Sequence, residues 1–90
     1  MPTIQIRLPA ALSDRAAGAS TVSVEATSVS TALSRLAARH PDLERLVFDP
    51  SGELRPHVHL FLGARQVRAE GEDALTDGDE LRIVPSIAGG

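Results

Sequence analysis

The sequence of 90 residues contains no cysteine, tryptophan, tyrosine or lysine, and only two phenylalanines. The lack of cysteine excludes disulfides, thiolate nucleophiles, iron–sulfur clusters and cysteine-based zinc sites. The scarcity of aromatic side chains leaves few stacking platforms for single-stranded nucleic acid, and a net charge of -3 does not suit a phosphate backbone. We therefore expect the partner to be a protein or a small molecule, and not a nucleic acid.

Long hydrophobic runs are also absent. No apolar stretch approaches the roughly 20 residues that cross a bilayer, and the N-terminus lacks the pattern of a secretory signal. We therefore expect a cytoplasmic protein with no membrane contact. All nine basic residues are arginines, so the chain offers no lysine amine through which copies could be joined by isopeptide bonds.

The length and composition favour one folded domain. Ninety residues are too few for two cores, while 42% hydrophobic and 23% charged residues are typical of a globular chain. Residues 3–8, 21–25, 58–62 and 81–84 alternate between apolar and polar, which predicts strands, and a short strand is expected around residue 67. The residues from Pro9 through Gly18 are predicted to form a loop, and Pro85 is predicted to end the last strand.

A helix is predicted between the second and third strands. Apolar residues at positions 29, 32, 33, 36 and 37 form one helical stripe, and Thr27 or Ser28 can cap its start. Pro41 should end this helix near residues 38–40, and a short helical turn is expected over residues 42–47. The order β-β-α-β-β-β, with one amphipathic helix to cover one face of the sheet, predicts a two-layer α+β domain.

Two polar clusters have alternative interpretations. Residues 70–80 hold six carboxylates, which form either a solvated face or a charge that steers the protein toward basic partners, and Asp77-Gly78-Asp79 predicts a tight turn. Residues 70–80 do not supply the full set of oxygen ligands that a calcium-binding loop requires. His57 and His59 share a strand face, but no third ligand is evident, so we expect no metal site.

The C-terminal residues give the most specific signal. Gly89 and Gly90 add no side chain to a core, so a frayed end is the simplest interpretation. Without Cβ atoms, however, such a segment can also thread a narrow channel and present the Gly90 carboxylate to another active site. Adenylation would convert that carboxylate into a mixed anhydride, which a sulfur or nitrogen nucleophile can attack.

Residues 77–90, DGDELRIVPSIAGG, resemble the closing segment of the ThiS/MoaD family of sulfur carriers. The opening β-β-α pattern, the Asp49-Pro50 loop and residues 58–62 before Gly63 are similar to the branch of this family that supplies a cysteine synthase. The resemblance implies a ubiquitin-like β-grasp fold: a mixed sheet of four to five strands with one main helix across it. This domain would span residues 1–85, followed by a flexible tail over residues 86–90.

The resemblance also implies a function. An E1-like enzyme would use ATP to adenylate Gly90, sulfur would displace AMP, and the thiocarboxylate would donate sulfur to an acceptor synthase. The product would be cysteine or another thiolated metabolite, with molybdopterin and thiamine as further options. Gly89 and Ala88 would lie in the partner's channel, and Ile87 would set the depth of the tail. The chain would be a carrier, not an enzyme, with no bound cofactor, and a recycling metalloprotease is a further candidate partner.

The outward-facing residues of the predicted strands suggest a surface for binding a partner protein. By alternation, Phe61 and Val84 point away from the core and, with Pro85, form a candidate docking patch, unless a loop covers Phe61 or the register is shifted by one.

The alternative function is a ubiquitin-like modifier joined through Gly90 to lysines of other proteins. A third interpretation is an interaction module whose Gly-Gly end is incidental. We expect a monomer.

Overall fold

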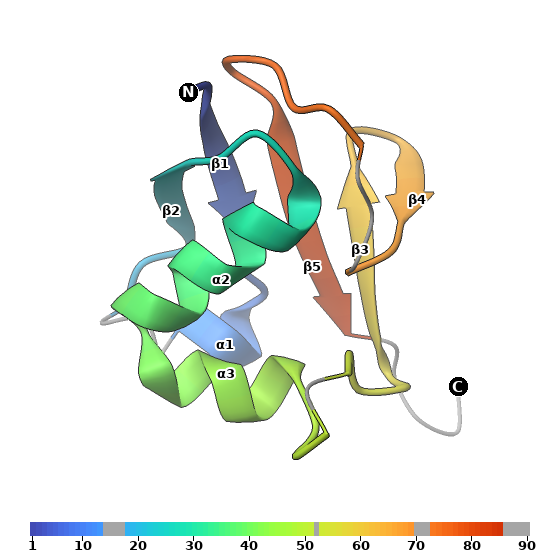
Figure 1. Cartoon of the computed structure of the whole chain (residues 1–90). Coiled ribbons are helices and arrows are strands. Elements are labelled where there is room, and N and C mark those ends of the chain that lie inside the picture. The colour runs from blue at the N-terminus through green and yellow to red at the C-terminus, as the bar shows by residue number, and fades with distance from the viewer. Residues whose placement is uncertain (14–17, 52, 70–72, 86–90) are drawn as a thin grey trace.

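The computed structural model describes residues 1–13, 18–51, 53–69 and 73–85. One sheet and a layer of helices form the described part of the molecule (Figure 1). The strands are β1 (Thr3–Arg7), β2 (Thr21–Glu25), β3 (Val58–Leu62), β4 (Arg65–Val67) and β5 (Glu80–Pro85), and the helices are α1 (Ala10–Ser13), α2 (Val29–Arg39) and α3 (Pro41–Val47). The strand order in the sheet is β2-β1-β5-β3-β4.

The first and last strands lie side by side at the centre of the sheet. Strand β5 pairs in parallel with β1 and antiparallel with β3, while β1–β2 and β3–β4 are antiparallel pairs. The sheet is therefore mixed and has five strands, as the family resemblance implied. Because β5 has a neighbour on each side, the strand that leads to the C-terminal residues belongs to the centre of the fold.

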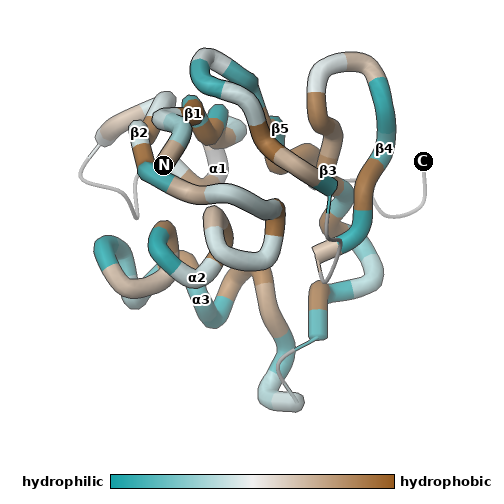
Figure 2. The backbone as a smooth tube through the Cα atoms, turned by 45° about the horizontal axis from the view of Figure 1, so that its top comes forward, coloured by the Kyte–Doolittle hydropathy of each residue, from teal (hydrophilic) through white to brown (hydrophobic). Residues whose placement is uncertain are grey.

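The core lies between one face of the sheet and helix α2. Helix α2 buries the predicted apolar stripe, and its N-cap is Ser28, whose Oγ accepts a hydrogen bond from the Thr31 amide at 3.3 Å. The most deeply buried large side chains come from the inner faces of the strands and from the helices: Ile4, Ile6, Leu43, Leu60, Leu81, Val29 and Val47. Figure 2 shows that strands and helices alike mix hydrophobic and hydrophilic residues, as expected where only one side of each element is buried.

Three local predictions were wrong. The predicted loop after Pro9 contains the short helix α1, where the amides of Leu12 and Ser13 donate to the Pro9 carbonyl at 2.9 and 3.0 Å and the Leu12 side chain joins the core. Helix α3 begins at Pro41 and not at residue 42, because proline at the first helical position has no amide to satisfy. Strand β5 includes Pro85, which pairs with Val58, whereas the prediction ended the strand before it.

In the part of the chain that the structure describes, no helix is long and apolar enough to span a bilayer.

Candidate functional site

Strand β5 carries the chain toward the predicted tail. Residues 80–82 pair with β1, and residues 81–85 pair with β3, so the pairing runs as far as Pro85, the last residue described. The predicted tail residues Ile87, Ala88, Gly89 and Gly90 lie outside the described residues, so their roles stay predictions. The structure does show that the segment before them is held by strand pairing on the sheet.

The turn before β5 is fixed by hydrogen bonds to β1. The Thr3 amide donates to Asp77 Oδ1 at 2.8 Å, and the Thr3 carbonyl accepts from the Gly78 amide at 2.8 Å. Asp79 Oδ2 accepts from the Thr76 amide at 2.8 Å, which closes the turn. Gly78 has a φ of 91°, a conformation that favours glycine, so the predicted tight turn is present.

Other carboxylates of the acidic stretch pair with arginines of the same chain. Asp73 lies 3.0 Å from Arg65, and Glu80 lies 3.7 Å from Arg7. Together with the turn contacts, these pairs give the described carboxylates of residues 73–80 local structural roles. The two interpretations of the whole acidic stretch, a solvated face and a charge that steers the protein toward basic partners, both stay predictions.

Phe61 and Val84 lie on the sheet face opposite helix α2. The register pairs Phe61 with Arg82 and Val84 with His59, so Phe61 and Val84 are diagonal neighbours on adjacent strands. Both side chains are half-buried, whereas Leu81 and Ile83 of the same strand are buried in the core. The alternation therefore places the two residues on the same face, as expected, and their docking role stays a prediction. Pro85, also half-buried, follows Val84 at the end of the strand.

Basic groups surround this apolar pair. The Arg82 guanidinium carbon lies 5.9 Å from the Phe61 ring centroid, within the range of a cation–π contact. Arg82 also donates to the Gly63 carbonyl at 3.4 Å and pairs across the parallel ladder with Arg7. We refer to the surface formed by Arg7, His59, Phe61, Arg82 and Val84 as the open-face patch.

The two arginines of the open-face patch were not predicted from the sequence. Arg82 could have been found, because it lies two residues from Val84 and so shares its face. Arg7 could not be placed there from alternation alone, since its position beside Arg82 depends on the parallel pairing of β1 with β5.

The histidines do not gather into a metal site. Among the described residues, no group of three or more histidine, aspartate or glutamate side chains could hold a metal ion. His59 Nδ1 lies instead 3.2 Å from Gln66 Nε2 of the neighbouring strand. The hydrogen bond orients the imidazole within the open-face patch.

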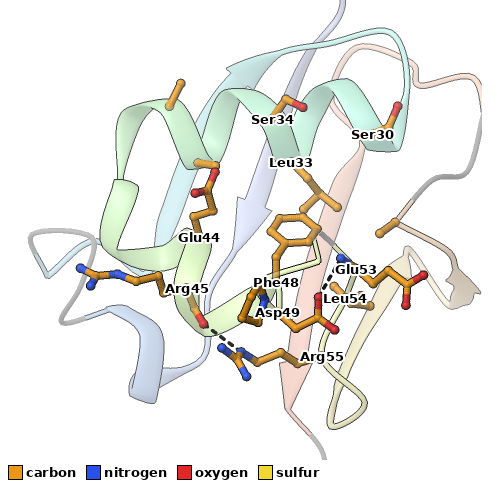
Figure 3. A pocket seen from close by; sticks show the side chains of 14 residues that line it. Ser30, Leu33, Ser34, Glu44, Arg45, Phe48, Asp49, Glu53, Leu54 and Arg55 are labelled. Atoms are coloured by element: carbon orange, nitrogen blue, oxygen red, sulfur yellow. Dashed lines mark hydrogen bonds between the residues drawn. The ribbon is translucent and has the colours of Figure 1, made fainter.

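A hollow lies on the helix side of the molecule, with a volume of about 1260 Å³ (Figure 3). Figure 3 shows the Phe48 ring beside Leu33 and Leu54 at its centre. The Arg55 Nε donates to the Arg45 carbonyl at 2.8 Å, which ties the loop after α3 back to that helix. The packing of Phe48 and Leu54 against the core and the hydrogen bond of Arg55 hold residues 48–51 and 53–55 against the helices.

Asp49 organises the loop that borders this hollow. Its Oδ1 accepts hydrogen bonds from the Ser51 hydroxyl at 2.5 Å and from the amides of Ser51 and Glu53 at 2.9 and 3.1 Å. The hydrogen bond from the Ser51 hydroxyl contributes most to lowering the pKa of the Asp49 carboxyl below its usual value of 3.8, and the two amide hydrogen bonds lower this pKa further. The side chain therefore acts as an ionised acceptor that closes the turn.

Comparison with known proteins places this chain in a family. The model of the ThiS family matches residues 6–90. Small archaeal modifier protein 1 of Haloferax volcanii is 39% identical over 77 residues, which cover 82% of this chain and 86% of that protein. The sulfur carrier protein CysO of Mycobacterium tuberculosis is 29% identical over 91 residues, covering 97% and 98%.

Solved structures of both relatives have the same fold. The crystal structure of the Haloferax volcanii protein has a TM-score of 0.84 at 33% identity and covers 98% of this chain and 99% of its own. The crystal structure of Mycobacterium tuberculosis CysO has a TM-score of 0.81 at 26% identity and covers 93% and 99%. The fold is therefore the ubiquitin-like β-grasp implied by the sequence resemblance.

Proposed function

Because this chain belongs to the ThiS family, we propose that it is a sulfur carrier whose Gly90 carboxylate is converted into a thiocarboxylate. The observation that carries the proposal is the family match, which runs through residue 90 and so includes Gly89 and Gly90. CysO, named as a sulfur carrier protein, aligns over nearly its whole length with this chain and supports the same function.

The proposed chemistry takes place at one carbonyl carbon. The Gly90 carboxylate attacks the α-phosphorus of ATP, which forms an acyl-adenylate and releases pyrophosphate. A sulfide sulfur then adds to the activated carbonyl carbon, the bond to AMP breaks, and a thiocarboxylate remains. An E1-like enzyme supplies the site for both steps, because the carrier contributes the reacting terminus and no catalytic side chain.

The carrier then passes its sulfur to an acceptor synthase. The thiocarboxylate sulfur attacks an electrophilic carbon of the acceptor, whose leaving group departs, so that the product is joined to Gly90 through an acyl–sulfur bond. Hydrolysis of this bond releases the thiol product and regenerates the Gly90 carboxylate. Cysteine formation is the outcome that the relationship to CysO favours. A metalloprotease that hydrolyses the bond between Gly90 and the product would return the carrier to the cycle.

We assign docking on the activating enzyme to the open-face patch. It lies on the face that helix α2 leaves uncovered, and it combines the half-buried Phe61 and Val84 with the exposed Arg82. Arginine and aromatic side chains around a small apolar centre are typical of residues that contribute most to protein binding. Because Val84 precedes Pro85 on β5, an enzyme bound to this patch lies at the strand that continues into the tail.

The test is intact mass spectrometry of the chain after incubation with ATP, the activating enzyme of the same organism and a sulfide source. We expect replacement of one oxygen by sulfur at the C-terminus, and no change in a variant that lacks Gly90. Gly90-dependent exchange of pyrophosphate with ATP shows that the enzyme is active. Exchange without any gain of sulfur would overturn the carrier proposal.

A protein modifier is the second candidate, because a relative with 39% identity is named a modifier protein. In that case a lysine amine of another protein attacks the activated Gly90 and forms an amide. Affinity purification of a tagged chain from cells separates the two functions. Amide-linked adducts on other proteins support the modifier, and a pool of free thiocarboxylate supports the carrier.

A further inference from the structure

Strand β2 forms an edge of the sheet beside helix α2, and its outer side has no strand partner among the described residues. We propose that this edge binds an extended acidic peptide segment of a partner protein, which adds to the sheet as a further strand. The inference goes beyond the proposed sulfur chemistry, because it concerns a surface separate from the open-face patch.

The backbone of β2 directs amides and carbonyls away from β1 at alternate residues. The Leu8 amide bonds the Ser20 carbonyl at 2.8 Å, and the Ala26 amide bonds the Pro2 carbonyl at 3.0 Å. In an antiparallel ladder these bonds recur at every second residue, so the even-numbered residues of β2 face β1. The amides and carbonyls of Thr21, Ser23 and Glu25 therefore point to the free edge, and all three residues are exposed.

Two arginines of α2 lie along the same edge. Arg35 and Arg39 are exposed and, together with Ser23, Val24 and Glu25, line a groove of about 400 Å³ between the helix and β2. The Arg39 guanidinium donates a hydrogen bond to the outward carbonyl of Ser23. A cationic groove beside an open strand edge matches a strand whose side chains on the helix side are carboxylates.

The contact between Arg39 and Ser23 places a charged side chain across the open edge of β2. An arginine that occupies an outward carbonyl blocks uncontrolled strand pairing. When an acidic segment arrives, one of its amides takes the Ser23 carbonyl, and the released guanidinium pairs with the incoming carboxylate. Binding therefore replaces the hydrogen bond between Arg39 and Ser23 with a backbone hydrogen bond from the peptide to Ser23 and an ion pair between Arg39 and a peptide carboxylate.

The location allows simultaneous use of the C-terminus. Strand β1 separates β2 from β5, so a peptide on the β2 edge leaves β5 and the open-face patch uncovered. A partner could hold the carrier by this edge while another enzyme works on the tail.

The experiment selects binders to the full chain from a random octapeptide library displayed on phage. We expect enriched peptides to carry acidic residues at alternate positions and to lack proline. In the complex with the best peptide, nuclear Overhauser effects should connect peptide amides to Thr21, Ser23 and Glu25. The variant Ser23→Pro should weaken binding about tenfold or more, because it removes the outward amide while sparing the ladder to β1.

A double substitution and a control test the charge. Arg35→Gln with Arg39→Gln should also weaken binding about tenfold and flatten its dependence on salt. Arg45→Gln removes an exposed arginine of α3 and should leave affinity unchanged. No enriched peptide, enrichment without acidic residues, or equal binding by the Ser23→Pro variant with an intact NMR spectrum would each overturn the proposal.

Discussion

The side chains of neighbouring residues in β5 lie on opposite faces of the sheet. Leu81 and Ile83 are buried in the core, while Arg82 and Val84 belong to the open-face patch. Large-to-small substitutions on the inner face should cost about 2–5 kcal/mol of stability. Substitutions on the outer face remove little buried area, so they should change binding much more than folding.

Truncation of the open-face patch should weaken docking. We expect Phe61→Ala and Val84→Ala each to reduce affinity for the activating enzyme by about 1–2 kcal/mol, because they remove the apolar centre of the patch. Isothermal titration calorimetry measures the change. Leu46→Ala is the matched control, since Leu46 is an exposed apolar residue on α3. Unchanged affinity in both patch variants would place the docking surface elsewhere.

Gly78 should be replaceable only by a residue that tolerates a positive φ. A Cβ at this position meets nothing within 4 Å, so the cost of Gly78→Ala arises from the φ of 91°. We expect a loss of about 1–2 kcal/mol in the free energy of unfolding, measured with urea. Gly78→Asn should lose less, because asparagine adopts this conformation more readily. Equal losses would point to the side-chain volume and not to the backbone.

At the scale of elements, the loop after α3 should respond to acid. The pKa of Asp49 is lowered in the folded chain, so its stabilising effect is present above the usual value of 3.8 and is lost as the pH falls through the lower folded value. An NMR titration of the Asp49 carboxyl carbon should give a midpoint below 3.8. Ser51→Ala should raise this midpoint, because the Ser51 hydroxyl gives the largest contribution. A midpoint of 3.8 or above in the unmodified chain would contradict the assigned hydrogen bonds.

The elements that were predicted correctly have a repeating pattern on one face. The alternation of residues 21–25 reproduces β2, and the stripe from Val29 predicts α2 because both patterns follow from burial on one side. Helix α1 has four residues, too few to show a helical period, and it is held by bonds to the Pro9 carbonyl. Its apolar contribution, Leu12, carried no signal that distinguishes a helix from a loop.

Pairing between strands was beyond what alternation can predict. The contact of β1 with β5 joins residues far apart in the sequence, and only the family resemblance implied a mixed sheet. The same limit applies to the site. Phe61 and Val84 follow from period-two patterns, whereas Arg7 joins them only through that long-range pairing.

At the scale of the whole molecule, the lack of lysine should prevent self-conjugation. The chain has no lysine side chain, so an activated Gly90 meets no ε-amine on another copy. In a reaction with ATP and the activating enzyme, we expect no side-chain-linked dimer by denaturing electrophoresis and mass spectrometry. Arg45→Lys places an amine on an exposed position of α3 and tests whether the missing lysine is the cause. Side-chain-linked dimers of the unmodified chain would contradict the prediction.

The central pairing of β1 with β5 also affects how the chain matures during synthesis. Strand β1 is translated well before its parallel neighbour β5, because the two strands are far apart in the sequence. Contacts of such long sequence separation form late, so the sheet cannot close on a nascent chain that lacks β5. A product that terminates before β5 would therefore lack the central strand of the sheet. Only chains that include β5 can complete the open-face patch, which takes Arg82 and Val84 from this strand.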